Sequence, residues 1–422
     1  MRIEILCTGD EILTGKTVNT NYGYIATRLV EFGLGVHWGT TVGDDRESLL
    51  LAFRQAAERA DAVIVNGGLG PTVDDLSQEV AAQAAGVPLV LHEPWLARME
   101  SFYARRNRVM PANNRKQAML PEGAEFIDNP IGTACGFAVD VGKTRFYFTP
   151  GVPREMRRMV DEQIIPRLLA RAGMRQATRL KRFHSFGIGE SRADELLAGI
   201  EAMAPDGRVK LGFQSHYPQL ETKLAARGAD QTEIDRMLAP IEAEVRRRLG
   251  NFILAEDDAT PESVVLEALR AQGGTLALAE TLTGGGIAAR LAPLPGAEAL
   301  FRRGLVARDL GQLRNALGLP ETDGAAVSPA LATEAATALC ARSGASHALA
   351  VLIALDDGPD RMETGGTICI GIADARGSVS REARLLGGRE WVRLGAMELG
   401  LDCLRRRLLG LPVDERIDFE RR

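Results

Sequence analysis

The stretch "VIVNGGLGPTVDDLSQE", residues 63–79, indicates the fold class, because an apolar strand runs into a glycine turn and then into a helix. On either side of it, over residues 1–170, short β-branched runs alternate with helical stretches. Such alternation predicts an α/β domain with a mostly parallel sheet covered by helices on both faces. Ligands of such sheets bind outside the carboxyl ends of the strands. We therefore expect the binding region in the loops after the first and third strands.

The same stretch carries groups suited to a phosphate and a metal ion. Its glycines let the backbone approach a phosphate, and the start of the next helix favours an anion. Its threonine can donate a hydrogen bond to a phosphate oxygen, and its aspartates are hard oxygen ligands for Mg²⁺ or Mn²⁺. The alternative is a tight turn whose acids cap the helix. The residues concerned are Gly67, Gly68, Gly70, Thr72, Asp74 and Asp75.

Other loops of residues 1–170 add polar candidates. The first strand-to-helix loop, "TGDEILTGKTVNTN", places Asp10 and Glu11 before a run of amides. Asp44 and Asp45 follow the second strand, where we favour helix capping over binding. Amide, cationic and loop groups that suit a base, ribose or phosphate follow at Asn19, Asn21, Asn114, Lys116, Gly151 and Glu155.

Bulk properties narrow the class of protein. The chain has 422 residues, which is enough for two or three domains, and its formal net charge is −5. That charge argues against a general electrostatic grip on nucleic acid. The five cysteines are widely spaced and suggest neither a disulfide framework nor a zinc site. With no signal peptide and no apolar run of 18 residues, we expect a reduced, cytoplasmic protein that does not enter a membrane.

The texture of the chain changes twice after residue 170. Residues 171–255 read as a small α+β module with a strand, a glycine turn, a hairpin and a helix. Residues 256–413 return to α/β texture, with strands near 275–280, 347–355 and 366–373. The charged tail, residues 414–422, is expected to fray.

Four motifs of the first domain resemble one known family. They are "GDEILTGKTVNTN", "GGLGPTVDD", "NNRKQAMLPEGA" and "PGVPREM", in this order and spacing. Together they resemble the N-terminal domain of the CinA family (competence/damage-inducible), which is similar to the molybdopterin-binding MogA and MoaB fold. "FGIGES", residues 186–191, resembles the middle module of that family, and "LAETLTGG" and "GGREWVR" resemble the frame of its C-terminal domain.

The resemblance implies two activities on breakdown products of the nicotinamide cofactor. The N-terminal domain resembles a divalent-metal-dependent ADP-ribose pyrophosphatase, using Mg²⁺, Mn²⁺ or Co²⁺. The C-terminal domain resembles an amidase that converts nicotinamide mononucleotide to nicotinic acid mononucleotide. A homodimer is implied as well. Glycine donors, hydroxyls and carboxylates independently suit a metal-bridged diphosphate, and we assign metal or water handling to Asp10, Asp74 and Asp75, leaving open which one is the base.

The amidase motif is altered in this chain. The family usually shows Glu-Ser-Cys-Thr-Gly-Gly, with the serine as the presumed nucleophile, whereas residues 280–285 read "ETLTGG". Downstream, a tyrosine and a lysine of the family are replaced by Arg308 and Leu313. Thr281 keeps a hydroxyl, but a hydroxyl needs a neighbouring base, and arginine stays protonated. Asp309 or His347 would serve only in a new arrangement.

We therefore expect a C-terminal domain that keeps its frame and has lost its amidase. The residues of this degenerate site are Glu280, Thr281, Thr283, Gly284, Gly285, Arg308, Arg389 and Arg393. The leading hypothesis is an ADP-ribose hydrolase with a degenerate partner domain. The alternatives are a non-catalytic nucleotide-binding or regulatory scaffold, a residual amidase, and, by fold analogy alone, a molybdopterin-handling enzyme.

Overall fold

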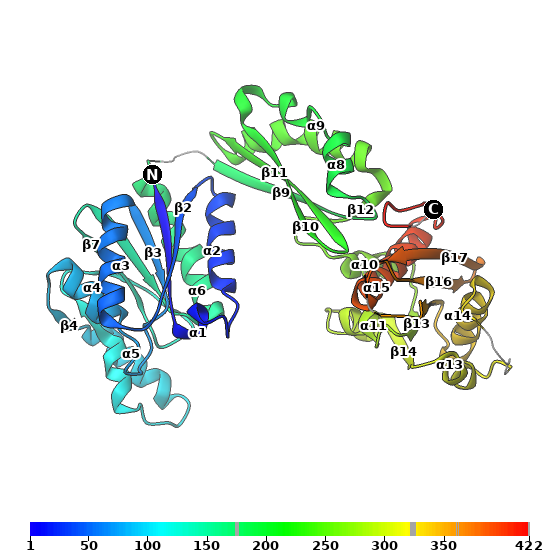
Figure 1. The fold of residues 1–422 in the computed structure, drawn as a ribbon, viewed down its shortest axis with the longest axis horizontal. Coiled ribbons are helices and arrows are strands. Elements are labelled where there is room, and N and C mark those ends of the chain that lie inside the picture. The colour runs from blue at the N-terminus through cyan, green and yellow to red at the C-terminus, as the bar shows by residue number, and fades with distance from the viewer. Residues whose placement is uncertain (174–176, 321–325, 360, 362, 421–422) are drawn as a thin grey trace. The chain divides into compact units, whose positions relative to one another are not determined.

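The computed structural model describes residues 1–173, 177–320, 326–359, 361 and 363–420 (Figure 1). The chain folds into two compact units. Unit 1 comprises Met1–Arg179 with Arg227–Ile234, and unit 2 comprises Leu180–Ala226 with Asp235–Arg422. Across the described ranges, no helix combines the length and the apolar character needed to cross a bilayer.

Unit 1 is built on a six-stranded sheet in the order β2-β1-β3-β8-β7-β6. Strand β1 runs parallel to β2 and β3, and β3 runs parallel to β8. The β8–β7 and β7–β6 pairs are antiparallel. The carboxyl ends of four strands therefore meet at one edge, as predicted for a mostly parallel sheet. The strands are β1 (Ile3–Thr8), β2 (Val36–Val42), β3 (Ala62–Asn66), β6 (Glu125–Ile127), β7 (Gly136–Val141) and β8 (Thr144–Thr149). A separate ribbon pairs β4 (Leu89–Leu91) with β5 (Met119–Pro121).

Helices cover both faces of this sheet. Strand β8 shows the two sides, because Phe146 and Phe148 belong to one core and Tyr147 to the other. Helices α3, α4 and α5 cover the first core, and α2, α6 and α7 cover the second. The helices are α1 (Asp10–Leu13), α2 (Thr20–Glu31), α3 (Arg46–Arg59), α4 (Ser77–Ala85), α5 (Glu93–Ala104), η1 (Ala112–Ala118), α6 (Pro153–Met159), η2 (Val160–Ile164) and α7 (Ile165–Arg171).

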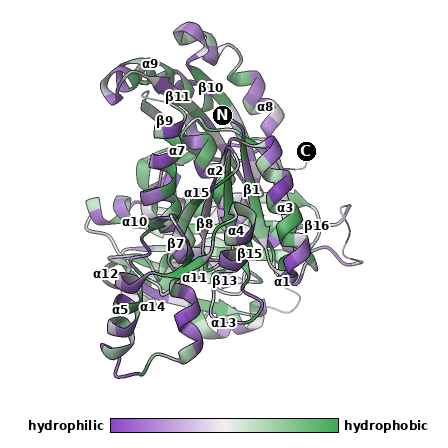
Figure 2. Ribbon diagram, turned by 90° about the vertical axis from the view of Figure 1, so that its left-hand side faces the viewer, coloured by the Kyte–Doolittle hydropathy of each residue, from purple (hydrophilic) through white to green (hydrophobic). Residues whose placement is uncertain are grey.

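Burial follows from this layering. Every residue of β1 and β3 is buried, as expected for parallel strands covered on both faces. Figure 2 shows predominantly hydrophobic strands, whereas surface helices such as α3 mix hydrophilic and hydrophobic residues. Helix α4 ends at Ala85, and the residue after it, Gly86, caps the helix with a left-handed φ of 72°.

The middle module has a four-stranded sheet in the order β10-β11-β9-β12. The predicted hairpin is confirmed, since β10 and β11 pair in antiparallel register from Val209 to Ala226. The strands are β9 (Ala177–Phe186), β10 (Val209–His216), β11 (Gln219–Gly228) and β12 (Ile253–Glu256). The helices are α8 (Glu190–Leu196), η3 (Ile200–Met203), η4 (Pro205–Gly207), α9 (Gln231–Leu249) and η5 (Gly250–Phe252).

The C-terminal domain has a five-stranded sheet in the order β14-β13-β15-β16-β17. Strand β13 is parallel to both β14 and β15, and the remaining pairs are antiparallel. The strands are β13 (Leu276–Thr281), β14 (Phe301–Ala307), β15 (His347–Leu355), β16 (Gly365–Asp374) and β17 (Gly377–Leu386). The helices are α10 (Pro261–Ala271), α11 (Gly286–Leu291), α12 (Ala297–Leu300), α13 (Leu310–Leu317), α14 (Pro329–Ser343) and α15 (Arg389–Leu409).

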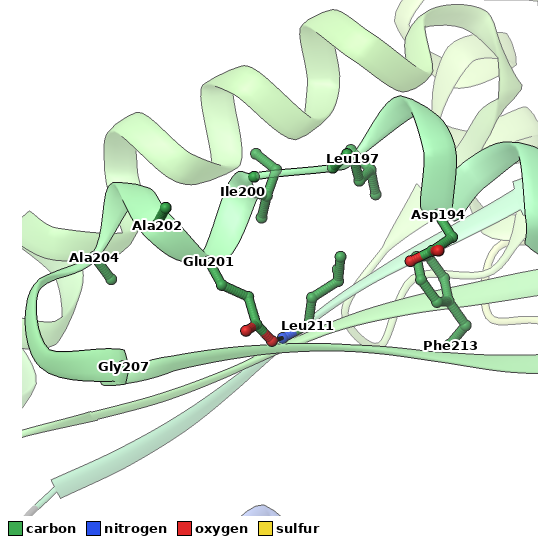
Figure 3. Close-up of a pocket in the computed structure, with 11 residues that line it drawn as sticks. Asp194, Leu197, Ile200, Glu201, Ala202, Ala204, Gly207, Leu211 and Phe213 are labelled. Carbon is green, nitrogen blue, oxygen red and sulfur yellow. Dashed lines mark hydrogen bonds between the residues drawn. The ribbon is translucent and has the colours of Figure 1, made fainter.

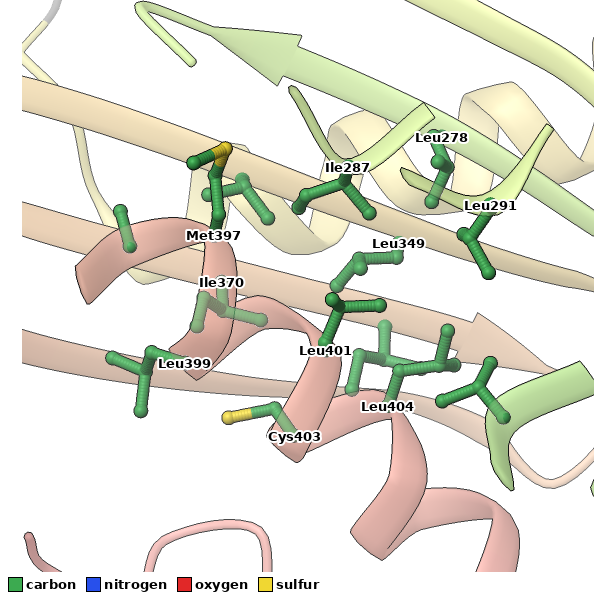
Figure 4. Packing of buried hydrophobic residues seen from close by; sticks show 14 of the residues in the cluster. Leu278, Ile287, Leu291, Leu349, Ile370, Met397, Leu399, Leu401, Cys403 and Leu404 are labelled. Carbon is green, nitrogen blue, oxygen red and sulfur yellow. The ribbon is translucent and has the colours of Figure 1, made fainter. Parts of the chain in front are cut away.

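Helix α15 packs across this sheet and forms the centre of the core (Figure 4). Its residues Leu401 and Leu404 lie in one cluster with Leu349 of β15 and Ile287 of α11. The approach of α11 to α15 is close, because a Cβ added at Gly286 would meet the sulfur of Met397 at 2.1 Å. The turn that opens α11 is therefore held directly against α15.

The C-terminal tail does not fray as predicted. Within the part described, up to Glu420, Ile417 is buried, and the Phe419 ring lies 6.2 Å from that of Phe186. Glu420 forms an ion pair with the buried Arg381. The prediction was wrong because it weighed the charges of this segment and overlooked the two apolar side chains that alternate with them.

Candidate functional site

A cavity of about 420 Å³ lies at the carboxyl edge of the unit 1 sheet, where the loops after β1, β2, β3 and β8 meet. The position agrees with the rule for open α/β sheets. Glycine backbone and hydroxyl, amide and carboxylate side chains line it. The lining residues that bear on binding are Thr8, Glu11, Asp44, Gly67, Gly68, Gly70, Asp74, Asp75, Gln117, Thr133, Gly151 and Glu155.

The glycine turn after β3 has no room for side chains. Gly67 and Gly68 adopt φ 112° and 68°, which L side chains rarely tolerate. A Cβ at Gly67 would lie 2.6 Å from Thr8 Oγ1, and one at Gly68 would lie 2.3 Å from Ser77 Oγ. Ser77 in turn donates to the carbonyl of Gly67 over 2.9 Å. The turn thus presents backbone to the cavity.

Two of the three predicted carboxylates line the cavity, and the third bonds to a neighbouring loop. Asp74 and Asp75 line the cavity, as the sequence motif suggested. Asp10 is not a lining residue: its N–H donates to the Asp44 carboxylate over 3.0 Å, and its own carboxylate accepts from the Asp44 N–H over 3.3 Å. Its neighbour Glu11 lines the cavity instead. Asp10 and Glu11 are adjacent acids in one loop, and their sequence alone does not show which of the two faces inward.

The second acid pair also divides. Asp45 caps α3 by accepting from the N–H of Ser48 over 2.9 Å, as expected. Asp44, for which capping was favoured, is a lining residue. Burial raises the pKa of Asp44, and the charges of Asp10, Glu11 and Asp74 raise it further. The acids of this edge therefore repel one another.

Other predicted binding residues support the loops and do not line the cavity. Asn19 caps α2, and the Asn21 amide donates to Gly151 O over 2.7 Å. Asn114 is buried and donates to the Tyr103 hydroxyl. Lys116 Nζ donates to Thr72 O over 3.1 Å. The N–H of Thr72 donates to Asp75 Oδ2 over 2.9 Å, which fixes the turn that carries Asp74.

The loop after β8 completes the rim. A Cβ at Gly151 would lie 3.7 Å from Gly67 Cα, so the loops after β3 and β8 approach closely. Glu155, at the start of α6, accepts a 2.7 Å hydrogen bond from the amide of Asn129. Asn129 is fully buried, and it was not singled out from the sequence because one asparagine in a loop carries no recognisable pattern.

The chemistry of the rim fits a hard divalent cation. The lining carboxylates are the oxygen donors that Mg²⁺ and Mn²⁺ prefer. Two buried oxygens beside the site, Thr8 Oγ1 and Asn21 Oδ1, have no hydrogen-bond partner among the described residues. No set of three acidic, histidine or cysteine side chains is gathered closely enough, within those ranges, to form a metal site. Asp10, Asp74 and Asp75 therefore do not form one coordination shell.

A larger cavity, of about 610 Å³, lies in the middle module (Figure 3). Leu197, Ile200, Leu211 and Phe213 supply much of its lining, and its charged lining residues are Asp194 and Glu201. Figure 3 shows Glu201 beside Leu211, whose N–H donates to the Glu201 carboxylate over 2.7 Å. None of the residues singled out from the sequence lines this cavity, whereas several of them line the cavity of unit 1.

The turn after β13 is held by Glu280. Its carboxylate accepts hydrogen bonds from the Thr283 hydroxyl (2.7 Å) and from the N–H groups of Ile287 and Ala288 (3.0 Å each). Gly284 and Gly285 adopt φ 68° and 80° within the turn. Both side chains in this network, Glu280 and Thr283, are almost fully buried. The turn is a closed hydrogen-bonded structure.

The Thr281 side chain is also engaged in a structural hydrogen bond. Its side-chain oxygen accepts from the N–H of Ile353 over 3.0 Å, and its exposed fraction is 2%. Strand register pairs His347 with Leu276, so about 16 Å of strand separates His347 from Thr281 at roughly 3.3 Å per residue. Asp309 caps α13 by accepting from the N–H of Gln312. His347 is therefore too distant to act as a base for the Thr281 hydroxyl, and the Asp309 carboxylate is engaged in the cap of α13.

The three arginines predicted for the degenerate site, Arg308, Arg389 and Arg393, have different surroundings. Arg393 pairs with Glu390 and donates to Thr283 O over 3.4 Å, so it contacts the turn. Arg389 begins α15. Arg308 is exposed after β14, where the family has its tyrosine, and Leu313, at the position of the lysine, is fully buried. The chain therefore has a buried apolar side chain where the family has a lysine.

Three family models match successive parts of the chain. They describe a probable molybdopterin binding domain (residues 4–170), the damage-inducible protein CinA KH domain (180–255) and the CinA C-terminal domain (258–408). A CinA-like protein from Shewanella sediminis (strain HAW-EB3) is 41% identical over 418 residues, covering 98% of this chain and 97% of that protein. The chain belongs to the CinA family.

A second full-length relative agrees with this assignment, and one solved structure is similar over part of the chain. A CinA-like protein from Shewanella denitrificans is 38% identical over 420 residues, covering 98% of this chain and 97% of that one. The crystal structure of a CinA of unknown function from Thermoplasma acidophilum is 35% identical and covers 39% of this chain and 96% of its own, with a TM-score of 0.37. The resemblance inferred from the motifs is confirmed at the level of the CinA family and its domains.

Proposed function

We propose that unit 1 hydrolyses diphosphates of the ADP-ribose type, with ADP-ribose cleaved to AMP and ribose 5-phosphate in a metal-dependent reaction. The supporting observation is a single cavity that combines the backbone of the Gly67–Gly70 turn with the carboxylates of Glu11, Asp44, Asp74, Asp75 and Glu155. Backbone donors suit phosphate oxygens, and carboxylates suit a cation that bridges them. The chain would then act in recycling the breakdown products of the nicotinamide cofactor.

The turn is the element that binds the diphosphate in this proposal. Gly67 and Gly68 let a phosphate come within hydrogen-bond distance of the main chain, and the unpartnered Thr8 hydroxyl lies beside them. Gly151 narrows the site from the opposite loop. The substrate would be positioned largely by backbone, since Lys116 is engaged with Thr72 and Glu79.

No three acids of the described residues are close enough to hold a cation by themselves, so the lining carboxylates would share it with phosphate oxygens of the substrate. Glu11 and Asp74 are the lining acids whose charges raise the pKa of Asp44, so these three are electrostatic neighbours. When bound, a divalent cation would neutralise charge on the diphosphate and lower the pKa of a bound water. Asp75 holds the turn through Thr72. Glu155, fixed by Asn129, is the lining carboxylate that we assign to accept a proton from the attacking water.

The C-terminal domain is proposed to lack amidase turnover. The supporting observation is that both side chains accept structural hydrogen bonds: Thr281 from the N–H of Ile353, and Glu280 from N–H groups at the start of α11. A nucleophilic hydroxyl needs a base within hydrogen-bond reach. Asp309 and His347 serve other positions. The domain would contribute structure to the chain and no second reaction.

The test incubates the full chain with ADP-ribose and with nicotinamide mononucleotide, each without metal and with Mg²⁺, Mn²⁺ or Co²⁺. Chromatography follows AMP and ribose 5-phosphate from the first substrate, and an ammonia assay follows deamidation of the second. Metal-dependent AMP with no ammonia supports both parts of the proposal. Binding of ADP-ribose without product under every metal would replace it with a non-catalytic nucleotide-binding scaffold, and ammonia release would restore the amidase.

A further inference from the structure

The segment after the last helix, Leu411–Glu420, packs against both the middle module and the C-terminal domain of unit 2. Its apolar side chains are inserted into the structure. Ile417 has an exposed fraction of 4% and belongs to the main hydrophobic cluster. The ring of Phe419 lies 6.2 Å from Phe186 and 5.8 Å from Tyr217, both in the middle module. Residues separated by more than 200 positions in the sequence are thereby joined.

The polar contacts of the segment with the middle module centre on the "FGIGES" motif. The Asp418 carboxylate accepts from the N–H of Gly189 over 3.0 Å and pairs with Arg192. The Asp418 N–H donates to the carbonyl of Gly187 over 2.8 Å. Glu415 accepts a 2.9 Å hydrogen bond from the amide of Asn251. The segment therefore makes main-chain and side-chain contacts with the same turn.

The turn is shaped for this segment. Gly187 adopts φ 83°, and a Cβ at this position would lie 2.3 Å from Cγ2 of Ile417. Only a glycine leaves space for the isoleucine, and the backbone conformation independently favours glycine. The proposed hydrolase site in unit 1 gives the "FGIGES" motif no role, and this fit supplies one.

The segment is also anchored to the C-terminal domain. Glu420 pairs with Arg381, and the exposed fractions of these two side chains are 8% and 3%. Arg381 also donates to Val413 O over 3.0 Å, and Arg406 donates to Pro412 O over 3.2 Å. A bridge between Leu385 and Glu420 extends the edge of β17. The same ten residues thus contact two modules through buried groups.

The contacts lead from the segment to the amidase-like turn. Tyr217, at the tip of the β10–β11 hairpin, stacks on Trp391 of α15 with ring centroids 3.6 Å apart, and its hydroxyl donates to Trp391 O. Gln219 of the same tip donates to Glu398 of α15 over 2.8 Å. Two residues beyond Trp391, Arg393 reaches Thr283 O. Phe419 therefore touches the residue that packs the hairpin onto α15.

We propose that Leu411–Glu420 is a C-terminal clasp, which docks on the Gly187–Arg192 turn of its own chain and holds the hairpin tip against α15. The partner that this surface fits is an acidic, apolar segment of the pattern Ile-Asp-Phe-Glu, because the surface offers a notch at Gly187 and cations at Arg192 and Arg381. The inference concerns unit 2 and stands independently of the reaction proposed for unit 1.

Hydrogen exchange of the full chain tests the clasp. The variant Ile417→Asp places a charge in the notch, and Asp414→Asn alters an exposed acid of the same segment as the matched control. We expect Ile417→Asp to raise exchange about tenfold or more in Gly187–Arg192, in the hairpin tip and in the first turn of α15. The control should match the wild-type protein. Faster exchange confined to the tail would overturn the proposal.

A second variant and a peptide keep the test decisive if Ile417→Asp unfolds the chain. Asp418→Ala removes the contacts with Gly189 and Arg192 and leaves the notch filled. It should raise exchange in the same three regions by a smaller factor. A synthetic peptide of residues 411–422, added in excess to whichever variant is folded, should restore protection at Gly187–Arg192. Wild-type exchange in Asp418→Ala, or no protection by the peptide, would contradict docking.

Discussion

The side-chain oxygen of Thr281 accepts a hydrogen bond from the backbone N–H of Ile353 at 3.0 Å, across the β13–β15 pair. The residue at the position of the family's presumed nucleophile is thus part of the sheet's own bonding. Its neighbour Glu280 is likewise bonded to Ile287 and Ala288. These hydrogen bonds stabilise the β13 turn independently of any reaction at Thr281.

Replacing Thr281 should therefore change stability and leave amidase activity at background. Thr281→Val keeps the shape and leaves the buried Ile353 N–H unsatisfied, which costs about 1–3 kcal/mol. Thermal unfolding measures this loss, and an ammonia assay with nicotinamide mononucleotide measures activity. Thr281→Ser, which keeps the oxygen, is the matched control. Ammonia release by the wild-type protein that disappears in Thr281→Val would show that the hydroxyl is catalytic.

Asp74→Asn should abolish most ADP-ribose turnover without unfolding the protein. Asp74 is exposed at the cavity, so its loss removes a ligand oxygen and little packing. We expect at least ~100-fold lower kcat/KM with Mg²⁺ or Mn²⁺, by chromatography of AMP. Asp140→Asn is the control, because Asp140 pairs with Arg145 at the opposite end of the sheet. Equal turnover in the two variants would remove Asp74 from the site.

Gly68→Ala should damage the site more than a comparable glycine change elsewhere. Gly68 and Gly86 share left-handed φ values of 68° and 72°, so alanine costs about 1 kcal/mol of backbone strain at either position. Only at Gly68 would the new Cβ meet a neighbour, Ser77 Oγ at 2.3 Å; nothing lies within 4 Å at Gly86. We expect Gly86→Ala to keep its KM for ADP-ribose and Gly68→Ala to lose binding. Matching KM values would refute a tight backbone cradle.

The pH dependence of stability should report on Asp374. Burial alone would raise the pKa of this carboxyl, but hydrogen bonds from Arg407 and Arg376 outweigh it and lower the pKa below its usual 3.8. A depressed pKa means that the stabilising contribution is present above about pH 4 and is lost as pH falls through the folded-state pKa. Asp374→Asn should cost about 2–3 kcal/mol at pH 7. The difference in Tm from wild type should shrink below pH 4; a constant difference would contradict the assignment.

Much of the fold was predictable because the periodicities are strong. The alternation over residues 1–170, the hairpin at 209–226 and the strand at 347–355 were all expected and are present. Strands β14 and β17 were not predicted. Two arginines and a glycine break the apolar run in β14, and β17 begins with an exposed glycine and two exposed serines. Edge strands carry weaker sequence signals because one side faces solvent.

The composition of the site was less predictable than its place. Sequence identified the loops that meet at the cavity, but it could not distinguish Glu11 from Asp10, since a single turn decides which carboxylate faces inward. Asn114 looked like a ligand for a base and is a buried support for Tyr103. Such roles depend on long-range neighbours, which no local pattern records.

The Glu420–Arg381 pair has a consequence for genetics. A premature stop just after Gly410 removes no helix or strand, yet it leaves the buried Arg381 without its carboxylate and Gly187 without Ile417. Losing one partner of a buried pair typically costs about 3–5 kcal/mol. Late nonsense alleles should therefore resemble core missense alleles in a mutational screen, and an affinity tag belongs at the amino terminus.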